Sequence, residues 1–94
     1  MIKKIVAQHV TKKLSRWYEQ NLKAYLSTLP MEAQASASLD KINRGYVGVI
    51  DIEISDLHFM AKGIEKDPCE LMSILLTDIY RQITDWKTGR YLAS

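Results

Sequence analysis

The strongest constraint on the fold is a period-two alternation of apolar and polar residues between positions 32 and 62. In "EAQASASLD" apolar and polar side chains alternate, and the same pattern returns in "YVGVIDIEI" and in "LHFMAKG". Such alternation is typical of strands that bury one face of a sheet. The connections are short: "KINRG", with Asn43 and Gly45 suited to positive φ, and "SD". The segment therefore predicts three consecutive strands in an antiparallel meander.

The meander also predicts which side chains are buried. Small residues on the first strand suggest that a helix lies close above it, because alanine leaves room for a close approach. The residues expected to point inward are Ala33, Ala35, Ala37, Leu39, Gly48, Ile50, Ile52, Ile54, Leu57, Phe59 and Ala61.

Helical periodicity flanks the meander on both sides. Between Val10 and Leu29 apolar residues recur at intervals of three and four, and Pro30 ends the segment. The second helix begins with Asp67 as N-cap, has Pro68 at its first position and ends near Gly89. Its expected buried stripe consists of Leu71, Met72, Leu75, Leu76, Ile79, Ile83 and Trp86.

The first residues of the chain are ambiguous. Residues 2–7 fit a helical period slightly better than a strand alternation. A cap at Thr11 would instead start the first helix there and leave these residues free to pair with a sheet. The residue pattern alone therefore predicts a small α+β fold and leaves open whether residues 2–7 form a strand or a helix.

Size and composition favour a small binding module. With 94 residues the chain is expected to form one domain, residues 1–94, too small for a deep two-domain catalytic cleft. Hydrophobic residues make up 47% and charged residues 26%, as in soluble globular proteins. We expect neither a membrane span nor a secretory signal, and the lone cysteine favours a cytoplasmic location.

Charge is distributed unevenly along the chain. Residues 1–30 hold six basic side chains against one acidic, a balance of +5, whereas the remainder holds seven against ten, a balance of −3. On the first helix Lys12, Arg16 and Lys23 form a ridge nearly opposite the apolar stripe, with Glu19 in its middle. The basic first third, which also includes Lys13, indicates a polyanionic partner.

No pattern of catalytic or metal-binding residues is found. Cys69 has no histidine near it in sequence and is expected to be a small, partly buried side chain. His9 and His58 are too far apart to form a spaced ligand set with it, and Asp51 and Glu53 are expected on a solvated sheet face. We therefore expect no enzyme, no cofactor and no metal site.

Two RNA-binding families resemble parts of the chain. "RGYVGVIDI" resembles the RNP1 motif of RNA-recognition domains, but Gly48 and Asp51 stand where base-stacking rings are needed. Helix, three strands and helix is also the order of double-stranded-RNA-binding domains. Those domains have a Lys-rich start of the second helix, whereas the sequence here is "KDPCEL". A divergent double-stranded-RNA-binding-like domain is therefore kept as an alternative.

A resemblance to another family covers most of the chain, from about Val10 to Ile83. "VTKKLSRWYEQNLKAYL", "DLHFMAKG" and "DPCELMSILLTDIYRQI" resemble the first helix, the final hairpin and the second helix of the ribosome hibernation-promoting factors, also called ribosome-associated inhibitor or sigma-54 modulation proteins. The resemblance lies in the order and spacing of these segments. It implies a β-α-β-β-β-α fold with both helices on one face of a four-stranded sheet.

The resemblance also implies a function. Members of the hibernation-promoting factor family bind the small ribosomal subunit near the tRNA and mRNA sites and favour inactive ribosomes under stress. The expected partners are thus the small subunit and its 16S rRNA. Because Glu70, Asp78 and Asp85 surround Arg81, and the tail adds only Lys87 and Arg90, contacts are expected mainly on the first helix. The residues expected to bind rRNA are Lys12, Lys13, Arg16, Lys23, Arg81 and Lys87.

One alternative belongs to a different functional class. The chain would then be a protein-protein interaction or homodimerisation module that uses an exposed strand edge or the outer sheet face. Val47, Val49 and Met60 are expected on that face, where they would form an apolar patch.

Overall fold

The elements of the chain follow the order β-α-β-β-β-α, as the resemblance implies. The computed structural model describes residues 2–30 and 32–89, with the backbone alone for residues 2–4. The elements are β1 (Ile2–Gln8), α1 (Lys12–Leu26), β2 (Gln34–Ile42), β3 (Gly45–Ile54), β4 (Leu57–Glu65) and α2 (Pro68–Lys87). The predicted α+β class is confirmed.

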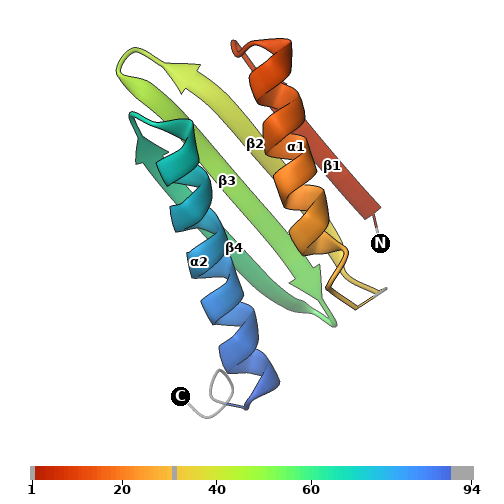
Figure 1. Cartoon of the computed structure of the whole chain (residues 1–94). Helices are drawn as coiled ribbons and strands as arrows, with labels where there is room; N and C mark the ends of the chain where they lie inside the picture. The colour runs from red at the N-terminus through yellow and green to blue at the C-terminus, as the bar shows by residue number, and fades with distance from the viewer. Residues whose placement is uncertain (1, 31, 90–94) are drawn as a thin grey trace.

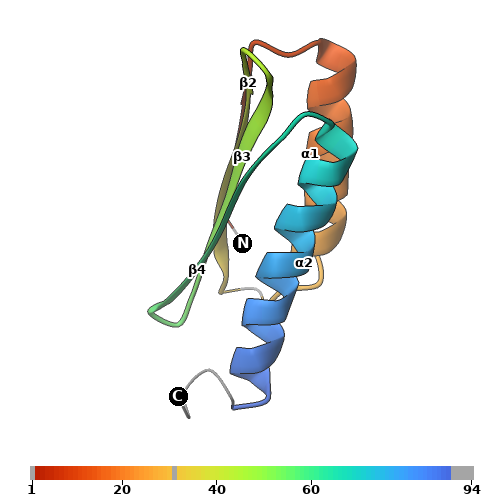
Figure 2. The same ribbon diagram turned by 90° about the vertical axis from the view of Figure 1, so that its left-hand side faces the viewer.

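The four strands form one mixed sheet in the order β1-β2-β3-β4. β1 runs parallel to β2, and α1 is the crossover that such a parallel connection requires. β2, β3 and β4 form the predicted antiparallel meander. Both helices lie on one face of the sheet, α1 over β1 and β2 and α2 over β3 and β4 (Figure 1, Figure 2). The helices run in the same direction and begin at the same end of the sheet (Figure 1).

The core lies between the sheet and the two helices. Nearly all the strand positions predicted to point inward are buried, and Leu57 is half-buried. From α1 the fully buried side chains are Tyr18, Leu22 and Leu26, and from α2 they are Leu71, Met72, Leu75, Ile79 and Ile83. Within this core the Tyr18 hydroxyl donates a hydrogen bond of 2.8 Å to the backbone oxygen of Ser38. Burial raises the pKa of Tyr18 well above its ordinary value.

Two paired glycines bring α2 close to the sheet. Gly48 on β3 and Gly63 on β4 are cross-strand partners. A methyl group on Gly48 would lie 2.8 Å from Cδ1 of Leu75 and 3.2 Å from the Tyr18 hydroxyl oxygen, and one on Gly63 would lie 3.1 Å from Cδ1 of Leu71. The first half of α2 therefore packs against a part of the sheet that has no side chains of its own.

Residues 2–7 are a strand, so the helical period that the sequence slightly favours there is wrong. β1 pairs with β2 along its whole length, from Ile2 opposite Gln34 to Gln8 opposite Asp40. This long-range pairing outweighs a local pattern of only six residues. His9, at φ 59°, turns the chain out of the strand, and Thr11 caps α1 by accepting a hydrogen bond of 3.1 Å from the Leu14 N–H.

Two further local features differ from the sequence prediction. α1 ends at Leu26 rather than near Leu29, because the chain turns at Ser27 and the Leu29 N–H bonds to the Leu26 carbonyl (3.1 Å). Leu29 is nevertheless buried. Of the two residues expected to have positive φ in the first hairpin, only Gly45 does, at 153°, and Asn43 does not.

The predicted ends of α2 are confirmed. The Asp67 carboxylate accepts a hydrogen bond of 2.8 Å from the Cys69 N–H, and Pro68 occupies the first turn. Gly89, at φ 86°, follows the C-cap Thr88.

We predict that Gly48→Val destabilises the fold. The added side chain must displace Leu75 and the Tyr18 hydroxyl, and such overpacking costs about 1–3 kcal/mol. Urea unfolding measures the change. Ser36→Val, on the exposed side of β2, is the control and should shift the free energy of unfolding by less than about 0.5 kcal/mol. Equal stability of wild type and Gly48→Val would contradict the close packing described here.

Candidate nucleic-acid interface

The predicted basic ridge lies on the exposed side of α1. Lys12, Arg16 and Lys23 are all exposed. Glu19 pairs with Lys23, at 3.0 Å between Oε1 and Nζ, while Lys12 and Arg16 have no carboxylate partner among the described residues. An exposed ion pair of this kind contributes little to stability, so Lys23 can exchange it for a phosphate. The ridge therefore offers three cations that can contact phosphates.

Lys13 lies apart from the ridge, on the side of α1 that faces α2. It lines a hollow of about 290 Å³ at the N-terminal ends of the two helices. The hollow is mainly apolar, and its other lining residues are Thr11, Leu14, Trp17, Pro68 and Cys69.

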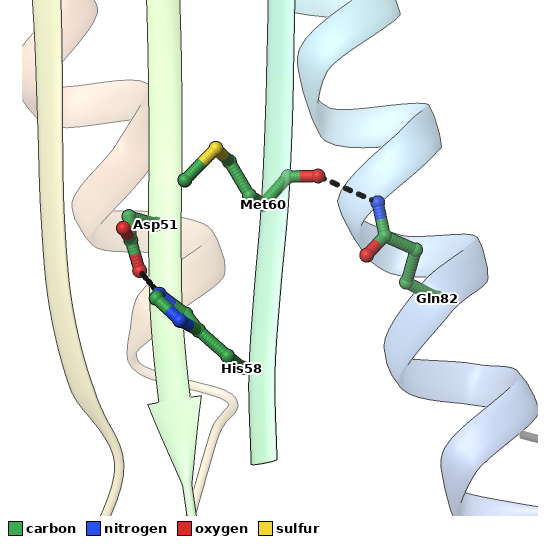
Figure 3. Close-up of polar contacts among 4 residues, drawn as sticks. All are labelled: Asp51, His58, Met60 and Gln82. Carbon is green, nitrogen blue, oxygen red and sulfur yellow. Dashed lines mark hydrogen bonds and ion pairs between the residues drawn. The ribbon is translucent and has the colours of Figure 1, made fainter.

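Arg81 is not brought together with the α1 ridge. Its guanidinium Nη2 lies 2.8 Å from Asp78 Oδ1. The neighbouring Gln82 donates a hydrogen bond of 2.8 Å to the Met60 carbonyl on β4, the edge strand farthest from α1 (Figure 3). Asp78, one turn before Gln82, shares that flank of α2. The predicted rRNA contact at Arg81 is thus on the far side of α2, beside a carboxylate that offsets its charge.

Lys87 occupies the last turn of α2 and is exposed. It follows Tyr80 by seven residues and so lies on the same side of the helix, away from Asp78. Arg90 lies outside the described residues.

Cys69 is exposed, so the expected partial burial is wrong. It lies on the side of α2 that faces α1, beside the core stripe that begins at Leu71. Each histidine pairs with a carboxylate: His9 with Asp40 (2.8 Å) and His58 with Asp51 (Figure 3). The described part of the chain holds no cluster of three or more His, Cys, Asp or Glu side chains suited to a metal ion.

The outer face of the sheet carries scattered apolar side chains. Met60 is 50% exposed and Ile64 59%, and Val47 and Val49 beside them are partly exposed. Polar groups interrupt this patch, among them the Asp51–His58 pair, which lies on the same face as Met60 (Figure 3). The apolar patch predicted from the sequence is therefore present but discontinuous.

Sequence reasoning missed an aromatic surface between the helices. The apolar residues that recur between Val10 and Leu29 include Trp17 and Tyr25, which are only partly buried. On α2, Tyr80 is 61% exposed. Burial, and to a smaller extent the neighbouring Tyr80, raises the pKa of Tyr25 to about 12. The two tyrosines thus lie near each other across the helices. The spacing of Cys69, Leu76 and Tyr80 along one side of α2 was the available signal.

Solved structures of other proteins have the same fold. A ribosomal subunit interface protein from Coxiella burnetii superposes with a TM-score of 0.72 over 94% of this chain and 99% of its own, at 14% sequence identity. The chain has the fold of that ribosomal subunit interface protein. The N-terminal domain of Protein Y from Thermus thermophilus matches with a TM-score of 0.58, at 16% identity, over 95% of this chain and 98% of its own.

Both structures belong to the hibernation-promoting factor family, so the resemblance found in the sequence is confirmed at the level of the fold. No family model and no curated protein matches the sequence itself. Among the described residues no helix has the length and apolar character needed to cross a membrane.

The fold also bears on the two RNA-binding families that resemble parts of the chain. β1 precedes α1 and runs parallel to β2, which differs from the helix, three strands and helix of double-stranded-RNA-binding domains. No strand follows α2 among residues 32–89, whereas an RNA-recognition domain requires one there.

We predict that stability falls with rising pH above 10, partly through Tyr25. Its pKa in the unfolded chain is about 10, so between pH 10 and 12 the unfolded state releases a proton that the folded state keeps. The free energy of unfolding must then decrease as pH rises. Urea unfolding at about pH 9 and about pH 11 should give a smaller loss for Tyr25→Phe than for wild type. An identical loss in both proteins would argue against this ionisation difference.

Proposed function

We propose that the protein is a non-enzymatic, cytoplasmic inhibitor of translation that binds the small ribosomal subunit through its 16S rRNA and stabilises inactive ribosomes under stress. The observation that carries the proposal is the exposed ridge of Lys12, Arg16 and Lys23 on a fold shared with a ribosomal subunit interface protein. The balance of +5 in residues 1–30 supports the same conclusion, since rRNA is a polyanion.

The basic side chains are expected to contribute unequally to phosphate binding, because some have a carboxylate beside them and others do not. The α1 ridge is the main phosphate-binding element because two of its cations have no described carboxylate partner and the third has only an exposed one. Lys13 and Lys87 extend the basic surface toward and along α2. Arg81 makes a weaker contribution, since Asp78 already neutralises it.

Binding to ribosomes should depend steeply on salt. Each phosphate that a basic side chain neutralises releases counterions and contributes about −0.7 to −0.9 to the slope of log K against log salt concentration. Co-sedimentation of the purified protein with small subunits across a salt series measures that slope. If no small-subunit binding occurs even at low salt, the proposal is wrong.

Reversing the charge of the ridge should abolish ribosome binding and leave the fold intact. We predict this for the triple variant Lys12→Glu, Arg16→Glu and Lys23→Glu, because exposed substitutions shift stability by no more than about 0.5 kcal/mol each. Co-sedimentation and thermal unfolding measure the two properties.

A second triple variant controls for net charge. Lys41→Glu, Lys62→Glu and Lys66→Glu make the same change in total charge at exposed positions on the strands and at the end of β4. This variant should keep most of the binding. A folded α1 variant that binds ribosomes as tightly as wild type would show that the contact lies on another face.

The apolar side chains on the outer sheet face favour a second candidate function, a protein-protein or homodimer interface. Met60 and Ile64 on β4 and Val6 on β1, which is 37% exposed, alternate with the core-facing residues of their strands and so lie on the outer face of the sheet. Neither helix covers that face (Figure 2). The free edge of β4 is less suitable, because Gln82 already occupies the Met60 carbonyl (Figure 3). Light scattering over a range of concentrations tests for a dimer, and a monomer throughout would remove the homodimer.

A further inference from the structure

The sides of α1 and α2 that face each other carry aromatic and basic residues. We call this the inter-helix surface and define it by Lys13, Trp17 and Tyr25 on α1 and Tyr80 and Lys87 on α2. Two observations place residues of both helices on facing sides: the hollow lined by Lys13, Trp17 and the start of α2, and the effect of Tyr80 on Tyr25 across helices that run in parallel (Figure 1). Lys87 is assigned to the Tyr80 side of α2 because it follows Tyr80 by seven residues.

The aromatic rings of this surface remain accessible. Trp17 lines the hollow and is only half-buried, and Tyr80 is 61% exposed although its neighbours on the core side of α2 are buried. Trp17 and Tyr25 are eight residues apart on α1, which is roughly 12 Å along the helix axis. The surface therefore presents rings at two levels rather than a single isolated aromatic side chain.

The charge of the inter-helix surface is basic. Lys13 lies at one end and Lys87 near the other. The acidic residues of the helices lie elsewhere. Asp78 shares the flank of Gln82, which bonds to β4, and Asp85 follows Asp78 by seven residues. Glu70 lies beside Ile64 and Lys66 at the end of β4. Glu19 belongs to the ridge on the other side of α1. The N-cap Asp67 is next to the hollow in sequence, and its carboxylate accepts the hydrogen bond from the Cys69 N–H. A polyanion can thus approach Tyr80 from the side of α2 opposite Asp78.

We propose that the inter-helix surface binds single-stranded RNA, with unpaired bases stacked on Tyr80 and Trp17 and phosphates beside Lys13 and Lys87. Aromatic rings flanked by basic side chains are the usual platform for single strands, because every base has a face that can stack. A duplex keeps its bases stacked on one another and cannot use the rings. The inference deepens the proposed function, on which it rests for the identity of the RNA as ribosomal.

The test compares two labelled RNAs by fluorescence anisotropy at low salt: a uridine 12-mer and a duplex of the same length. Tyr80→Ala should weaken binding of the uridine 12-mer about 5- to 150-fold, the effect of losing one stacked base, and leave duplex binding within about twofold. Tyr80→Phe keeps the ring and should bind within about twofold of wild type.

Ile74→Ala is the matched control on α2. Ile74 is also a large exposed side chain, 45% exposed, but it lines the surface that includes Asp78 and Arg81, on the other flank. This variant should bind the uridine 12-mer like wild type. Equal thermal midpoints for the Tyr80 and Ile74 variants would exclude unfolding as the cause of any loss.

Two results would overturn the inference. One is unchanged affinity of Tyr80→Ala for the uridine 12-mer. The other is failure of wild type to bind this RNA, which would leave the inter-helix surface to a protein partner. Co-sedimentation with small subunits separates this inference from the proposed function. If wild type binds ribosomes but not the uridine 12-mer, the stacking surface is refuted and the ribosomal function is not. If wild type binds the uridine 12-mer, Tyr80→Ala loses that binding, and wild type does not bind ribosomes, only the ribosomal function is refuted.

Discussion

The contact of α2 with the glycine pair of β3 and β4 positions much of the molecule. Gly48 and Gly63 leave no side chain between the sheet and the first half of α2, so Leu71 and Leu75 pack directly on the backbone. Tyr18 reaches the same place from α1 and bonds to the Ser38 carbonyl. Both helices are therefore held against the sheet around one point. Their facing sides, with the aromatic rings between them, keep a fixed relation to each other for the same reason.

Much of the fold could be predicted because its signals are local. The alternation in β2, β3 and β4 and the Asp67-Pro68 start of α2 are each contained in a few consecutive residues. β1 could not be predicted from its own residues, since its partner β2 lies more than twenty-five positions away in the chain. The end of α1 at Ser27 depends on hydrogen bonds in the turn, whereas Pro30, the visible signal, comes after it.

The candidate site also has features that local sequence predicts and features that depend on tertiary packing. Lys12, Arg16 and Lys23 could be assigned to one exposed ridge because a single helix fixes their relation. The pairing of Arg81 with Asp78, three residues apart on one helix, was within reach of the same reasoning. The proximity of Tyr25 and Tyr80 was not, because it depends on how two helices lie on a sheet.

The shared direction of α1 and α2 gives the molecule an electrical polarity. Each helix has a partial positive charge at its N-terminal end and a partial negative charge at its C-terminal end, and in parallel helices these add rather than cancel. Both positive ends lie at the same end of the sheet, where Lys12 and Lys13 begin α1 (Figure 1). A phosphate group near this end therefore meets the partial positive charge of two helix termini together with the side chains of Lys12 and Lys13.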